Sequence, residues 1–205
     1  LRIAGGLHAL HLAGAAPQLA PIYRGEAADD QAIIADVIRH FEAQLLPWLD
    51  GPPQTNEAGR SASIMAGLLW LAQRLGPRFE LLELGGSAGV NTMMDRFGFD
   101  LGGVRAGDPA SPMQIAPRWE GPPPPAGPVE ITAVAGCDIA PVDLADPVQA
   151  LRLKSYVWPD APGRMERIEA AIALAAQRRP DLVQADAADW VEARLARPQE
   201  AGVTR

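Results

Sequence analysis

The residues best suited to chemistry lie in one stretch, where an apolar run ends in an acid and a glycine-rich turn follows. Glu83 closes the run, and Gly85, Gly86, Ser87 and Gly89 form the turn. Glycines at this spacing let the backbone turn tightly and pass close to a small ligand, often a nucleotide. We therefore expect a strand, a ligand-binding turn and a helix in this order.

Two further acids are expected at strand ends beside this turn. Asp138 follows an alternating segment at 129–135, and Asp186 follows the short apolar segment 182–185. Ligands of parallel sheets bind beyond the carboxyl ends of the strands, where a carboxylate can accept hydrogen bonds from both hydroxyls of a ribose. The helix expected after Gly89 would offer free N–H groups to an anion. Taken singly, each aspartate is also a suitable helix cap.

The spacing of the turn separates the nucleotide-binding classes. It does not match the dinucleotide fingerprint Gly-x-Gly-x-x-Gly, and the chain has no phosphate loop ending in Gly-Lys-Ser or Gly-Lys-Thr. The string resembles motif I of the class I S-adenosylmethionine-dependent methyltransferases, acid-x-Gly-x-Gly-x-Gly, with a serine in place of the middle glycine. This resemblance implies an S-adenosylmethionine pocket formed by Glu83, Gly85, Gly86, Ser87 and Gly89, with Asp138 at the ribose and Asp186 near the adenine.

The glycine turn and the strings at 2–8, 52–57, 107–109, 136–138 and 156–160 span nearly the whole chain. With these strings, the chain resembles a bacterial family, the domain of unknown function 2332 family. The family is grouped with methyltransferase-like folds, and it implies no established activity. Its members are longer at both ends, so we expect this chain to be truncated and a further strand to follow Val203.

Hydrophobic periodicity indicates the elements that position these residues. Helical patterns cover most of residues 1–50, including 3–19 and the apolar face from Ile33 to Leu46, and another helix leads to Leu75. From residue 79 onward, strand and helix patterns alternate, which is typical of a parallel sheet with covering helices. We expect an α/β fold, a Rossmann-like doubly wound parallel sheet over residues 77–205, with an N-terminal helical cap over residues 1–76.

Polar loop residues supply candidates for a substrate or lid site. Asn56, Glu57 and Arg60 stand before the helix that leads into the glycine turn, and this polar patch is equally consistent with a helix cap and a solvated first turn. Asp108, in a Gly-Asp-Pro turn, is a further loop acid. No residue is identified as a catalytic base, and no Ser-His-Asp set can be assembled from the three histidines.

Composition limits the partners. The net charge of −7 and the lack of a long basic cluster argue against nucleic-acid binding. A single cysteine fits a reducing cytoplasm, and no apolar run reaches the roughly 18 residues of a membrane span. His8 and His11 lack a third ligand, so no metal site is expected.

These observations lead to three alternative functions. The first is methyl transfer from S-adenosylmethionine to a small-molecule or protein acceptor. The second is a non-catalytic module of the same fold that binds an adenosyl ligand or a partner. The third is an enzyme of another class that uses the same crevice for a different nucleotide. The sequence does not determine the acceptor or the oligomeric state.

Overall fold

The computed structural model describes residues 1–205, and the chain forms two compact units. The first unit contains residues 1–55 and 146–165, and the second contains residues 56–145 and 166–205. This division differs from the expected boundary at residue 76, because helix α5 (Ser61–Leu75) belongs to the second unit.

The first unit is entirely helical. Its core joins α1 to the segments that follow it, through buried residues such as Leu7, Leu19 and Val37. Gly5 and Gly6 lie inside α1 because a side chain there would collide with Tyr156 and Leu45, respectively. The helix expected over residues 3–19 ends at residue 12. The helices of this unit are α1 (Arg2–Leu12), η1 (Pro17–Leu19), α2 (Ala20–Tyr23), α3 (Asp30–His40), α4 (Glu42–Leu45), η2 (Leu46–Leu49) and α6 (Pro147–Ser155).

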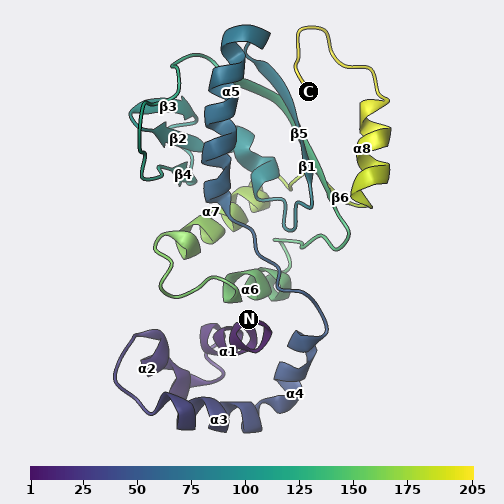
Figure 1. Cartoon of the computed structure of the whole chain (residues 1–205). Coiled ribbons are helices and arrows are strands. Elements are labelled where there is room, and N and C mark those ends of the chain that lie inside the picture. Colours follow the sequence, from purple (N-terminus) through teal and green to yellow (C-terminus); the bar gives the residue numbers. More distant parts are fainter. The chain divides into compact units, whose positions relative to one another are not determined.

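The second unit is built on a parallel sheet of three strands in the order β1-β5-β6 (Figure 1). In Figure 1, helices α5 and α8 lie on opposite sides of this sheet. The expected α/β class with a parallel sheet and covering helices is thus confirmed at this level. The elements are η3 (Ala58–Arg60), α5, β1 (Arg78–Leu84), β5 (Glu130–Asp138), α7 (Arg164–Gln177), β6 (Leu182–Gln184) and α8 (Ala187–Leu195). The first two residues of α7 belong to the first unit, and the rest of this helix belongs to the second.

A parallel bridge on the other edge of β1 extends this order. Thr204 pairs with Phe79, and its amide donates to the carbonyl of Arg78 at 2.9 Å. On the β5 side of β1, the amide of Glu130 donates to the preceding carbonyl, that of Pro77. Successive carbonyls of a strand point to opposite edges. Across the sheet, the order is therefore β6, β5, β1 and the segment at Thr204. The chain adds β5 and β6 on one side of β1 and then Thr204 on the other side, so the direction of winding reverses at β1.

A second, smaller sheet separates β1 from β5 in the sequence. A hairpin through Gly102-Gly103 joins β2 to β3, and β4 pairs with β2 in parallel. The prediction of a regular helix after the glycine turn is wrong in type. Residues 91–96 form a short 3₁₀ helix that leads directly into this sheet. The elements are η4 (Asn91–Arg96), β2 (Gly98–Leu101), β3 (Val104–Gly107) and β4 (Gln114–Ile115).

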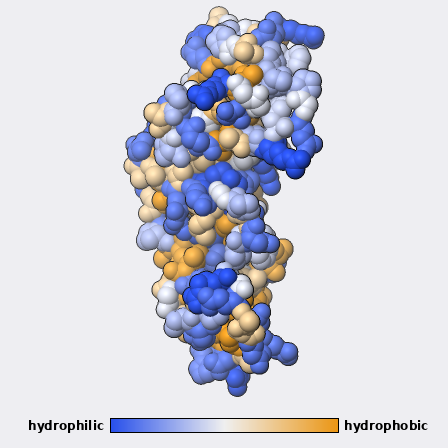
Figure 2. Space-filling model, turned by 90° about the vertical axis from the view of Figure 1, so that its left-hand side faces the viewer, coloured by the Kyte–Doolittle hydropathy of each residue, from blue (hydrophilic) through white to orange (hydrophobic).

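Apolar burial holds the second unit together around η4 and the two sheets. Phe79, Met93 and Phe97 are almost completely buried there. On the face in Figure 2, apolar residues are interspersed among hydrophilic ones. The longest helix, α5, has 15 residues, and no helix combines the length and apolarity that crossing a bilayer requires.

Candidate functional site

The glycine turn leaves the carboxyl end of β1 through three left-handed backbone positions. Gly85 and Gly89 have φ of 70° and 67°, and Ser87 has φ of 52°. Glycine adopts this region freely, whereas serine pays a conformational cost there. At the remaining glycine, Gly86, a Cβ would lie 2.8 Å from Leu182 Cδ1, so a larger residue would displace the Leu182 side chain. The turn is therefore fixed by both conformation and packing.

Hydrogen bonds tie the turn to the end of β5. The amides of Gly85 and Gly86 both donate to the carbonyl of Cys137, at 2.9 and 3.0 Å. The amide of Ser87 donates to Asp138 Oδ2 at 2.7 Å, and the amide of Ala140 donates to Oδ1 at 2.8 Å. Asp138 thus lies beside the turn, as expected, and both of its carboxylate oxygens already accept backbone hydrogen bonds.

The remaining part of the turn is held from the other side by a side chain of the loop before α5. Asn56 is buried, and its Oδ1 accepts from the amide of Val90 at 3.0 Å. The amide of Gly89 donates to Gly86 O at 2.7 Å. The expectation of free N–H groups after Gly89 is therefore wrong for these positions, since protein acceptors already occupy them.

The two other residues of that loop have different environments. Glu57 caps η3 by accepting from the amide of Gly59 at 2.9 Å, and it forms an ion pair with Arg167 at 2.8 Å. This contact supports the capping interpretation of Glu57. Arg60 is exposed, and its positive charge acts on the carboxyl of Glu83.

Glu83 and Asn91 form a polar pair at the end of β1. Asn91 Nδ2 donates to Glu83 Oε1 at 3.4 Å, whereas Glu83 Oε2 and Asn91 Oδ1 are buried without a hydrogen-bond partner. Burial raises the pKa of the Glu83 carboxyl, the Asn91 contact opposes this shift, and the nearby charge of Asp138 adds to it. A buried acceptor without a donor is costly, so these two atoms are able to accept hydrogen bonds from a ligand.

A cavity of about 340 Å³ opens beside this pair, against residues 80–83 of β1. Its walls are mostly apolar, and Glu80 lies at its border, held by Arg194 at 3.0 Å and Arg205 at 2.8 Å. A mainly apolar cavity with a few converging polar groups is the usual form of a small-molecule site. The lining residues are Ile64, Glu80, Leu81, Leu82, Glu83, Asn91, Met94, Val134, Leu195 and Arg205.

The other two predicted acids have local roles. Asp186 caps α8 by accepting from the amides of Ala188 and Asp189, so the capping interpretation holds for this residue. Asp108 lies in the loop after β3, where its carboxylate accepts from the amide of Ala110 at 2.8 Å. Its hydrogen-bond partners belong to the second sheet and its loops, not to the glycine turn.

Asn91 is the residue that sequence reasoning missed. It directly follows Val90 at the end of the turn, and only the short 3₁₀ geometry of η4 returns its side chain to Glu83. An acid and an amide eight positions apart carry no recognisable spacing signal. No group of three or more metal-ligating side chains is found in the structure.

Comparison with known proteins gives one match. Searches of the curated proteins and of the solved structures each found none. The family model that matches carries the description "Uncharacterized protein conserved in bacteria", domain of unknown function 2332, and it covers residues 1–205. The chain therefore belongs to the bacterial domain of unknown function 2332 family.

Proposed function

We propose that the carboxyl edge of the first sheet binds an adenosyl ligand of the S-adenosylmethionine type, and that the protein transfers a methyl group to a small-molecule or protein acceptor. One observation carries this proposal. The winding direction of the sheet reverses at β1, and the glycine turn and Glu83 lie at the carboxyl end of that strand. Ligands of open α/β sheets bind at such a switch point.

The distribution of hydrogen-bonding groups favours a ligand with an ammonium group over a bare phosphate. The amides of Ser87 and Val90 already have acceptors, so little of the turn remains to hold an anion. Glu83 Oε2 and Asn91 Oδ1 are acceptors without donors. The amino group of S-adenosylmethionine would supply N–H donors and a positive charge beside the Glu83 carboxylate.

The chemistry of methyl transfer places modest demands on the protein. The cofactor supplies the reactive methyl group, and the protein holds donor and acceptor in line. In this proposal, Gly85, Gly86 and Gly89 pass beneath the ligand, Asp138 faces the ribose and Asp186 borders the adenine. The acceptor would approach past Asn56 and Arg60, and no base is assigned.

Thermal unfolding with S-adenosylhomocysteine tests the binding step. A ligand at 100 times its dissociation constant adds about 2.7 kcal/mol of stability, which raises the Tm of a chain of this size by about 5–11 °C. Glu83→Gln should remove most of this shift, whereas Glu120→Gln, at an exposed ion pair with Arg118, should leave it unchanged. No shift with either S-adenosylmethionine or S-adenosylhomocysteine would overturn the proposal.

The internal hydrogen bonding of the turn also supports a second candidate, a non-catalytic module of the same fold. Asp138 and Asn56 hold the turn without any ligand. Binding of S-adenosylhomocysteine without methyl transfer from S-adenosylmethionine to a panel of acceptors would favour this module.

A further inference from the structure

The cavity of about 340 Å³ beside Glu83 is walled by apolar side chains from four elements. They are Ile64 of α5, Leu82 of β1, Met94 of η4 and Leu195 of α8. A cavity of this size and character holds a small molecule and orients it by a few polar groups. Its ligand therefore needs an apolar body.

The charged groups at one border of this cavity are already paired with each other. Glu80 Oε1 accepts from Arg194 at 3.0 Å, and Glu80 Oε2 accepts from Arg205 at 2.8 Å. Arg205 also donates to the carbonyls of Arg194 and Arg197. This border offers no unpaired charge to a ligand, which favours a neutral one.

Two buried acceptors without donors lie further along β1, about 10 Å from Glu80 at the usual rise of a strand. Glu83 Oε2 lies next to the glycine turn, since a Cβ on Gly86 would stand 3.5 Å from it. The amino group of the proposed adenosyl ligand would use this oxygen. Asn91 is only 8% exposed and lines the cavity, and its Oδ1 has no donor. A ligand with an N–H group would satisfy this acceptor.

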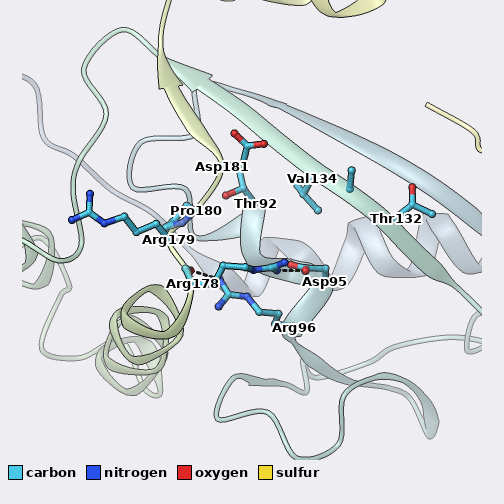
Figure 3. A pocket seen from close by; sticks show the side chains of 10 residues that line it. Thr92, Asp95, Arg96, Thr132, Val134, Arg178, Arg179, Pro180 and Asp181 are labelled. Carbon is cyan, nitrogen blue, oxygen red and sulfur yellow. Dashed lines mark hydrogen bonds and ion pairs between the residues drawn. The ribbon is translucent and has the colours of Figure 1, made fainter. Parts of the chain in front are cut away.

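The cavity in Figure 3, of about 270 Å³, has a different lining. Arg178 pairs with Asp95, and Arg96 donates to the backbone carbonyls of Leu174 and Arg178. The Arg179 guanidinium points away from Arg178 and Asp95 (Figure 3). An apolar ligand would have to desolvate charged groups there, so we expect it in the cavity against β1 instead.

We propose that the cavity against β1 binds a small, neutral, apolar amine, which donates its N–H to Asn91 Oδ1. The apolar body lies on Ile64, Met94 and Leu195. The role of this amine as methyl acceptor rests on the proposed function, whereas its binding does not. In the transfer, the nitrogen lone pair forms the bond to the methyl carbon while the carbon–sulfur bond breaks. Sulfur keeps that electron pair, and the resulting ammonium releases its proton to water.

Fluorescence titration of the whole chain with N-phenyl-1-naphthylamine tests the binding. This dye is neutral and apolar, carries one N–H, and fluoresces more strongly in apolar surroundings. We expect saturable binding of one molecule, and at least about tenfold weaker binding of 1-phenoxynaphthalene, measured by displacement of the dye. The ether has nearly the same shape but no N–H, so it leaves Asn91 Oδ1 without a donor. Asn91→Leu should remove this preference, since leucine has no acceptor.

Two exposed residues of α5 provide a matched pair of variants. Ile64 is 41% exposed and lines the cavity, whereas Leu71 is 45% exposed and does not line it. Ile64→Asp should weaken dye binding about tenfold, because a carboxylate replaces an apolar contact. Leu71→Asp should leave dye binding unchanged, and so should Arg179→Gln at the other cavity.

Three results would each overturn the inference: no saturable dye binding, equal affinities for the amine and the ether, or equal effects of Ile64→Asp and Leu71→Asp. S-adenosylhomocysteine separates this inference from the proposed function. A thermal shift with S-adenosylhomocysteine but no dye binding would overturn only the cavity ligand. Dye binding without a thermal shift would overturn only the adenosyl ligand.

Discussion

Replacing Asp138 by alanine should destabilise the second unit through the loss of a hydrogen bond between two strand ends. Oδ2 accepts from the amide of Ser87 at 2.7 Å, and Ser87 is only 6% exposed, so water cannot replace the lost acceptor fully. Oδ1 accepts from the amide of Ala140, which is exposed and regains water. A hydrogen bond to a charged group contributes about 1.5–3 kcal/mol, and a buried unpaired donor costs about 1–3 kcal/mol. We expect Asp138→Ala to cost about 2–4 kcal/mol in total.

Asp186→Ala is the matched control, because Asp186 also lies at a strand end but caps only its own helix. Loss of such a cap costs about 1 kcal/mol. Urea unfolding followed by circular dichroism gives the free energy of unfolding of both variants. Hydrogen exchange at the Ser87 amide reports directly on its hydrogen bond to Asp138. Exchange at this amide should accelerate in Asp138→Ala and remain slow in Asp186→Ala. Equal stability losses, or a Ser87 amide that stays protected in both variants, would refute the reasoning.

Two further predictions concern buried charge in each unit. Glu80→Gln leaves Arg194 and Arg205 without the carboxylate that joins them. Because the side chains of Glu80, Arg194 and Arg205 are only 14%, 18% and 10% exposed, this substitution should lower the free energy of unfolding in urea by about 3–5 kcal/mol. A loss below about 1 kcal/mol would match a surface ion pair and contradict this prediction. Burial lowers the pKa of His8, and the carbonyl of Ser155 at 3.0 Å opposes the shift only in part. The unfolded chain therefore binds the proton first as pH falls below about 6.5, so stability that is fully present above this pH should decline toward the lower pKa of the folded state. Unfolding measured between pH 7.5 and 5.5 checks this decline, and an unchanged slope in His8→Gln would exclude His8 as its source.

The sequence predicted the elements with strong periodicity and missed the contacts that join them. The alternating segment before Asp138 and the apolar run before Glu83 are both strands, and they pair in parallel. The segment after Gly89 is 3₁₀ because only six residues separate the turn from Phe97, whose neighbour Gly98 begins β2. So short a segment stabilises few helical hydrogen bonds, and packing determined its form.

The contact between Glu83 and Asn91 shows why part of the site resists prediction from sequence. The two residues are eight positions apart, and η4 returns the Asn91 side chain to Glu83. No periodic pattern encodes that proximity.

The hydrogen bonds of the glycine turn constrain what any ligand at the switch point can be. A phosphate loop binds through free backbone amides, but here Asp138 and Asn56 occupy the amides of Ser87 and Val90. A ligand must therefore be recognised by close approach to the glycines and by side chains, among which Glu83 Oε2 and Asn91 Oδ1 lack a donor. A cationic amine can donate to both acceptors, whereas a phosphate is repelled by them. The same hydrogen bonds that hold the turn without a ligand are therefore the reason why we propose an amino-bearing adenosyl compound, and not a nucleotide phosphate, as the ligand of this site.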